Sequence, residues 1–151
     1  MPYADHPLTK AEFDAIYAKV PRLTIELIIK NAEGAIYLSQ RAPDIQPCPG
    51  QWHLPGGTVR FGESVMDAVK RLAEREGVTV KRAELAGYID YPSHYLHMAD
   101  SPVALAFELV EYDGQPTKDV ESERTGWFKQ FPEPMHADQD QFLLAHGYIG
   151  G

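Results

Sequence analysis

Apolar residues near the start of the chain recur at helical spacing, and this period predicts an amphipathic helix. These positions are Phe13, Ile16, Tyr17 and Val20. Thr9 stands just before the helix and Glu12 follows it three positions later, the pattern of a capping box. Pro21 cannot continue a helix, so we expect this first helix to end before it.

Short runs rich in β-branched and aromatic residues follow, and they predict strands. The runs cover residues 23–29, 35–38, 80–91, 103–110 and 125–128. The segment Asn31–Gly34 between the first two runs indicates a hairpin. Asp113–Pro116 holds the Gly and Pro typical of a turn.

One long helix interrupts the strands, from Glu63 to Glu76. Its apolar stripe consists of Val65, Ala68, Val69 and Leu72. Gly77 is typical of a helix end, and Asp138–His146 predicts a closing helix. The order of elements indicates the α+β class, with a mixed β-sheet between helices in one domain over residues 1–151.

Composition narrows the function classes. The chain has 151 residues, is 44% hydrophobic and carries a net charge of −8. That charge repels polyphosphate chains and argues against a nucleic-acid partner. The first residues lack the apolar core of a signal peptide, and no apolar run approaches the ~20 residues that span a bilayer. Cys48 is the chain's one cysteine; it suits a reducing cytosol, and we expect no function for it.

The most informative segment is a Gly-rich turn that leads into the long helix. Five residues separate Gly57 from Glu63, seven separate Glu63 from Arg71, and Glu76 lies five positions beyond Arg71. This spacing resembles the signature of the Nudix hydrolases, whose box continues Arg-Glu-apolar-any-Glu-Glu after the second gap. The resemblance runs from about Leu23 to Phe128 and implies a Nudix-type α/β/α sandwich.

The resemblance also implies chemistry, and here the chain departs from the family pattern. Leu72 and Arg75 stand at two of the box glutamates. The chain is similar in this respect to the GDP-mannose mannosyl hydrolases, which bind one Mg²⁺. That branch implies Gly56, through its carbonyl, Glu76 and Glu121 as metal ligands. Ser122 stands at the position of the branch's general base, a histidine.

We predict the remaining roles from residue chemistry. Arg71 would fix Glu63 and Glu76, and Glu121 or Glu123 could orient the attacking water. Arg41 and Arg60 suit bidentate phosphate contacts. Four further candidates could contact the substrate: Glu26, which the mannosyl hydrolases imply, and His94, Tyr95 and His97. The alternatives are a solvent-facing strand residue for Glu26, surface-loop histidines for His94 and His97, and a core aromatic for Tyr95.

Two functions follow as hypotheses. The first is a Mg²⁺-dependent hydrolase of a nucleoside diphosphate linked to another group, with a nucleotide-sugar resembling GDP-mannose as substrate, by P–O or C–O cleavage. The second is a non-catalytic nucleotide-binding or regulatory module, which the departures at Leu72, Arg75 and Ser122 would suit. We expect a small-molecule partner, no membrane partner and a cytoplasmic location. Mn²⁺ in place of Mg²⁺, and a homodimer, stay open.

Overall fold

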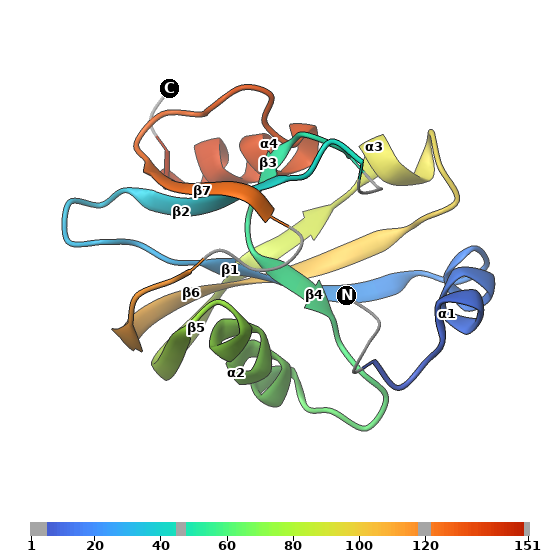
Figure 1. The fold of residues 1–151 in the computed structure, drawn as a ribbon. Coiled ribbons are helices and arrows are strands. Elements are labelled where there is room, and N and C mark those ends of the chain that lie inside the picture. Colours follow the sequence, from blue (N-terminus) through green and yellow to red (C-terminus); the bar gives the residue numbers. More distant parts are fainter. Residues whose placement is uncertain (1–5, 45–47, 118–121, 150–151) are drawn as a thin grey trace.

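The computed structural model describes residues 6–44, 48–117 and 122–149 (Figure 1). Four helices occur there: α1 (Lys10–Tyr17), α2 (Val65–Arg75), α3 (Pro92–Tyr95) and α4 (Ala137–Ala145). The strands are β1 (Arg22–Ile28), β2 (Ile36–Arg41), β3 (Trp52–His53), β4 (Gly56–Thr58), β5 (Val78–Asp90), β6 (Pro102–Gly114) and β7 (Ser122–Phe128). No helix in these ranges is long and apolar enough to cross a membrane.

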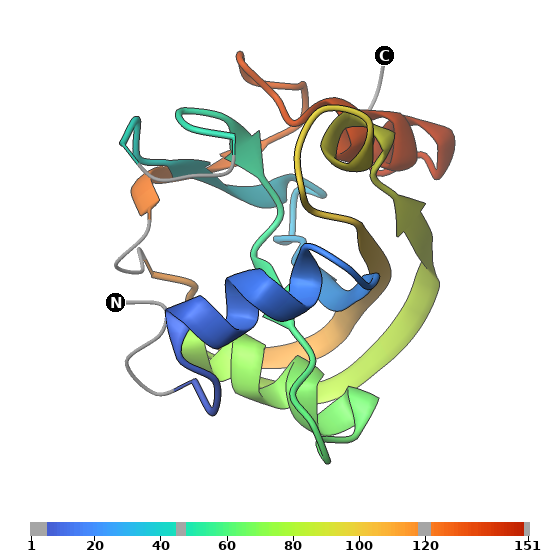
Figure 2. The ribbon, with the colours of Figure 1, turned by 90° about the vertical axis from the view of Figure 1, so that its right-hand side faces the viewer.

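The strands form two sheets. The larger has the order β4-β1-β6-β5, with β1 parallel to β6 and antiparallel to β4. The smaller, antiparallel sheet has the order β3-β2-β7. Helix α2 covers the larger sheet from one side, and α3 and α4 lie at the opposite end of the molecule (Figures 1 and 2). The expected α+β fold with a mixed sheet between helices is confirmed.

The hairpin expected at Asn31–Gly34 is only partly formed. An isolated antiparallel bridge, Lys30 with Ile36, closes the turn. Beyond it the two strands separate, because β1 pairs with β4 and β6 while β2 joins the other sheet. Strands β4 and β6 cover the two edges of β1. Residues on both of its faces are buried, including Ile25, Leu27 and Ile28, so both faces are covered as well.

Two apolar clusters result from this arrangement. One packs α2, through Ala68, Val69, Leu72 and Ala73, against one face of the larger sheet. The other fills the space between the two sheets and α4, with Trp52, Ile89, Tyr91 and Phe142 among its members. Glu26 and Ile28 alternate with Leu27 on β1, so Glu26 faces the second cluster.

Helix ends agree with the local sequence. Thr9 and Glu12 form both bonds of the predicted capping box. Helix α2 begins at Val65 rather than Glu63, because the Ser64 hydroxyl caps it by accepting from the Asp67 N–H. Its end at Arg75 is followed by Gly77 with φ +93°, a left-handed conformation that suits glycine.

Candidate functional site

The Gly-Gly turn is held at very short distance from its neighbours. In the β1–β4 pairing, Gly56 lies opposite Glu26. A Cβ on Gly56 would fall on the Ile25 carbonyl oxygen and the Glu26 carboxylate, and one on Gly57 would lie 2.8 Å from Leu72 Cδ2. A side chain at Gly56 would collide with backbone, and one at Gly57 would require Leu72 to move. The two glycines therefore let the backbone of β4 lie directly against β1 and α2.

Arg71 joins this turn to α2. Its Nε donates to Glu63 Oε2 at 2.7 Å, and its NH2 group donates to Glu63 Oε1 and to the Thr58 carbonyl, both at 3.0 Å. Glu63 Oε1 also accepts from the Arg60 N–H at 3.1 Å. The guanidinium lowers the pKa of Glu63 from its usual value. Arg71 thus holds Glu63 as predicted, whereas no hydrogen bond from Arg71 to Glu76 occurs among the described residues.

Glu76 is buried, with 1% of its surface exposed. It caps the C-terminus of α2 and lies one turn beyond Leu72 on the same helix face. Since Leu72 packs against Gly57, this face is the one turned toward β4. Glu74 and Arg75 are exposed, so both lie on the surface, away from that face.

The segment that leads to Glu121 begins beside Glu76. The Thr117 N–H donates to the Glu76 carbonyl at 2.6 Å, and the Tyr37 hydroxyl donates to the Thr117 carbonyl at 3.2 Å. On the other side of residues 118–121, Ser122 opens β7 opposite Arg41. Glu121 itself and the side chains of Ser122 and Glu123 lie outside the described residues, so the predictions for them stay predictions.

Glu26 is half-buried and belongs to a chain of hydrogen bonds. The Tyr91 hydroxyl donates to Glu26 Oε1 at 3.2 Å and accepts from Gln139 Nε2 at 2.9 Å. Gln139 in turn accepts from the Leu54 N–H at 2.7 Å. Burial raises the pKa of Glu26 to about 8, against the opposing effects of Tyr91 and nearby arginines. Glu26 is therefore a structured wall of the site rather than a solvent-facing strand residue.

His94 lies in a buried polar cluster that the sequence does not reveal. Its Nε2 is 2.8 Å from His136 Nε2 and 3.5 Å from Cys48 Sγ, and its Nδ1 is 2.9 Å from Asp100 Oδ2. Arg22 holds Asp100 with two hydrogen bonds, at 3.1 and 3.0 Å. Both nitrogens of His94 are thus engaged. Its partners are His136 and Cys48, and for Cys48 we expected no function.

The charges in this cluster influence one another. Burial opposes the thiolate, but the His136 and His94 imidazoles lower the pKa of Cys48 to about 6. Burial likewise opposes the imidazolium of His94, but Asp100 and Cys48 raise its pKa to about 9. Hydrogen bonds from His94 and Arg22 outweigh burial and lower the pKa of Asp100 to about 2.

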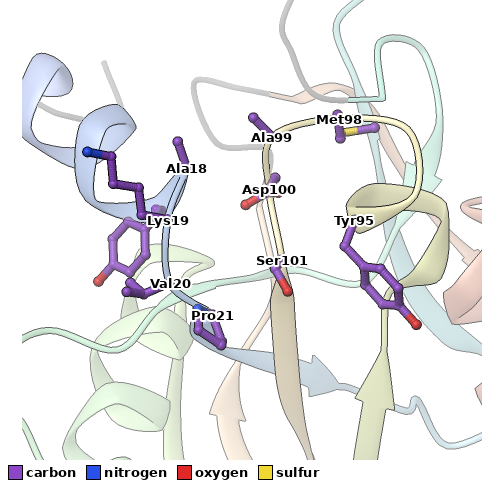
Figure 3. Close-up of a pocket in the computed structure, with 10 residues that line it drawn as sticks. Ala18, Lys19, Val20, Pro21, Tyr95, Met98, Ala99, Asp100 and Ser101 are labelled. Atoms are coloured by element: carbon purple, nitrogen blue, oxygen red, sulfur yellow. The ribbon is translucent and has the colours of Figure 1, made fainter.

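The other substrate candidates lie on the outside. His97 is exposed, and Tyr95 keeps 52% of its surface exposed. Tyr95 lines a cleft of about 240 Å³ between residues 17–21 and 98–101, which Figure 3 shows. No residue of β4 or α2 lines this cleft. Arg41 and Arg60 are half-buried. The structure therefore separates Tyr95 and His97 from the buried His94.

Comparison with known proteins agrees with the fold described above. The family model of the NUDIX domain matches residues 20–145. The low-salt glycan biosynthesis protein Agl8 of Haloferax volcanii is 32% identical over 150 residues, which is 94% of each chain.

Solved structures are similar as well. The MutT NUDIX hydrolase of Burkholderia pseudomallei superposes with a TM-score of 0.73 and 27% identity, over 87% of this chain and 100% of that one. The NUDIX domain of Shewanella oneidensis NrtR, in complex with ADP ribose, has a TM-score of 0.63 and 21% identity, over 93% of this chain and 97% of that one. At that identity, the NrtR likeness concerns the fold alone.

Proposed function

Because this chain belongs to the Nudix family of hydrolases, we propose that it cleaves a nucleoside diphosphate linked to a sugar, with one Mg²⁺ ion as cofactor. The observation that carries the proposal is the buried carboxylate of Glu76, on the helix face turned toward the Gly-Gly turn. Carboxylate oxygens are ligands that Mg²⁺ prefers, and this one lies where the family's box has its last glutamate.

The residues present fit a single Mg²⁺. This ion prefers oxygen ligands and commonly takes one or two carboxylates, waters and substrate phosphates. Glu76, the Gly56 carbonyl and Glu121 would supply the protein's share. Leu72 is buried in the apolar core and Arg75 is exposed, so α2 offers one carboxylate on this face. The bound ion would neutralise diphosphate charge and acidify a water; Mn²⁺ has the same preference for oxygen ligands.

The protein's other residues bind and orient. Arg41 and Arg60 would bind the phosphates, and Glu121 or Glu123 would orient the attacking water. Glu26 would contact the nucleotide at the wall formed with Tyr91. Arg71 acts through Glu63 and the Thr58 carbonyl, so it is a positioning residue. The exposed Tyr95 and His97 would contact the outer part of the substrate.

The substrate class rests on the branch that the box resembles and on the relative Agl8, whose name places it in glycan biosynthesis. The net charge of −8 suits a small-molecule substrate and argues against a nucleic-acid or membrane-surface partner. A homodimer and a cytoplasmic location stay predictions.

A panel of nucleotide-sugars, ADP-ribose, dinucleotides and nucleoside triphosphates, assayed with and without Mg²⁺, tests the proposal. We expect Mg²⁺-dependent release of products from nucleotide-sugars, with GDP-mannose among the best. Absence of turnover on the whole panel, combined with tight binding of one compound, would instead support the non-catalytic module.

We propose attack at phosphorus, since Ser122 is too weak a base to replace the histidine of the mannosyl hydrolases. Hydrolysis in ¹⁸O-labelled water then places the label in a phosphate group. Label in the released sugar would show C–O cleavage and contradict this part of the proposal.

A further inference from the structure

We propose that Cys48, His94 and His136 bind one Zn²⁺ ion, at a site separate from the magnesium site. The three residues come from the loop after β2, from α3 and from the N-cap of α4. One ligand atom from each lies within 4.8 Å of the others. In Figure 1, α3 lies beside the start of α4, and Ser93 at its first turn bonds to Asp138.

The distances suit tetrahedral coordination. Zinc lies about 2.3 Å from sulfur and about 2.0 Å from nitrogen, so adjacent ligands are about 3.5 Å apart for S–N and about 3.3 Å for N–N. The Cys48 Sγ to His94 Nε2 distance is 3.5 Å, which already matches. The two Nε2 atoms, at 2.8 Å, must separate by about half an ångström, a small movement for two side chains.

The ligand chemistry selects zinc over magnesium. A thiolate and two imidazoles form a set that zinc binds well, whereas Mg²⁺ requires oxygen ligands. The Mg²⁺ donors Glu76 and Gly56 offer oxygen only, so the two sites would not compete for the same ion. Three protein ligands leave a fourth position for water.

A neighbouring carboxylate already orients one ligand. Asp100 accepts from His94 Nδ1 at 2.9 Å and is itself held by Arg22. This arrangement points His94 Nε2 toward Cys48 and His136, as carboxylate–histidine pairs do in zinc proteins. Asp100 is thus a positioning residue for the metal.

Binding must rearrange protons. The proton that the Cys48 thiol and His94 Nε2 share leaves to solvent as the ion binds. His136 Nδ1 accepts from the Asp138 N–H at 3.2 Å. Because Nδ1 is an acceptor, the proton of the neutral His136 ring is on Nε2. Coordination through Nε2 moves this proton to Nδ1 by exchange with solvent, and the bond from Asp138 breaks. The loss of one hydrogen bond is small beside the free energy that a thiolate and two imidazoles supply to a bound zinc ion.

The ion would hold the wall of the nucleotide site. The Tyr91 ring contacts both imidazoles edge-on, with centroids 5.2 Å from each. The hydroxyl of the same Tyr91 bonds to Glu26, which lies against Gly56. Zinc would therefore fix three separate segments around Tyr91, and removing it should loosen this wall without removing any magnesium ligand.

Titration of metal-free full-length protein with Co²⁺, then Zn²⁺, in excess Mg²⁺ tests the site. We expect one Co²⁺ per chain, with a thiolate-to-cobalt charge-transfer band and visible bands of tetrahedral intensity, all abolished by one equivalent of Zn²⁺. Cys48→Ser should lose the charge-transfer band and at least about 100-fold in affinity, more than loss of an outer partner costs. Circular dichroism and melting of metal-free variants check folding.

Two further variants keep the test decisive. Asp100→Asn should retain the thiolate band but bind about 10- to 100-fold more weakly, as expected for a positioning residue. His97→Gln, a change of an exposed histidine in the same segment, should bind like the wild type. Absence of Co²⁺ and Zn²⁺ binding by the wild type, or an unchanged band in Cys48→Ser, would overturn the proposal and leave the cluster as a metal-free thiolate–imidazolium pair.

Discussion

Removing the Arg71 side chain should destabilise the protein, because the guanidinium connects three parts of the site. Arg71→Ala deletes two charge-assisted hydrogen bonds to Glu63 and one to the Thr58 carbonyl. Bonds to charged groups contribute about 1.5–3 kcal/mol each when well shielded. The Arg71 and Glu63 side chains keep 24% and 14% of their surface exposed, so water can replace part of the lost hydrogen bonding. We expect a loss of about 2–3 kcal/mol in the free energy of unfolding.

A double-mutant cycle with Glu63→Gln isolates the pair. Urea unfolding at pH 7 should give a coupling energy of about 1–2 kcal/mol between Arg71 and Glu63, with unchanged m-values. The Arg82–Glu84 pair is the matched control, with exposures of 52% and 63%, and its coupling should stay below about 0.5 kcal/mol. If the Arg71–Glu63 coupling is also below about 0.5 kcal/mol and Arg71→Ala loses substrate affinity, Arg71 binds phosphate instead of holding Glu63.

The same pair predicts a pH dependence. Arg71 lowers the pKa of Glu63 in the folded state below its usual value of 4.5. The stability that the pair contributes is therefore fully present above pH 4.5 and is lost as the pH falls through the lower, folded pKa. The difference in unfolding free energy between wild type and Glu63→Gln should narrow below pH 4.5. A difference that stays constant from pH 7 downward would contradict an ionised, paired Glu63.

Two substitutions test the packing around the turn. Leu72→Glu restores the residue type of the family's box, but Leu72 is 2% exposed, so the new carboxylate would be a buried, unpaired charge. We expect the variant to lose more than about 3 kcal/mol of stability and to gain no Mg²⁺ affinity. A stable variant that binds a second Mg²⁺ would contradict this. Gly56→Ala should lower the free energy of unfolding, measured by thermal unfolding, by about 2 kcal/mol or more, because the added Cβ meets backbone. The control Gly34→Ala has open space around the Cβ but φ +81°, so it should lose only about 1–2 kcal/mol. Equal losses would show that the contact at Gly56 relaxes.

The sequence predicts the elements that local patterns specify. Thr9 and Glu12 determine the start of α1, and Gly77 the end of α2. The division into two sheets is not encoded in the Asn31–Gly34 turn. It depends on β1 pairing with β6, roughly 80 residues later in the chain, and such a long-range pairing carries no local signal.

The candidate site likewise has a part that the sequence predicts and a part that it does not. The spacing of Leu72 and Glu76 along the chain is enough to place both on one face of a helix. The cluster around His94 could not be found, since its partner atoms come from residues 42 and 46 positions away. Cys48 and His136 have no motif spacing between them, and each has apolar or proline neighbours typical of an ordinary loop. The packing of α3 against α4 brings His94 beside His136. The bridge between Trp52 and Met135 brings the segment after Cys48 to His136.

Mg²⁺-dependent product release by Glu76→Gln tests the central claim most directly. The substitution keeps the size of the side chain and removes the charge that would hold the cation. With GDP-mannose or the best nucleotide-sugar of the panel, we expect turnover to fall at least about 100-fold, more than loss of an outer partner of a metal costs, with the fold intact by circular dichroism. Glu74→Gln, at an exposed position two residues earlier, should turn over like the wild type. Full Mg²⁺-dependent activity in Glu76→Gln would contradict the account.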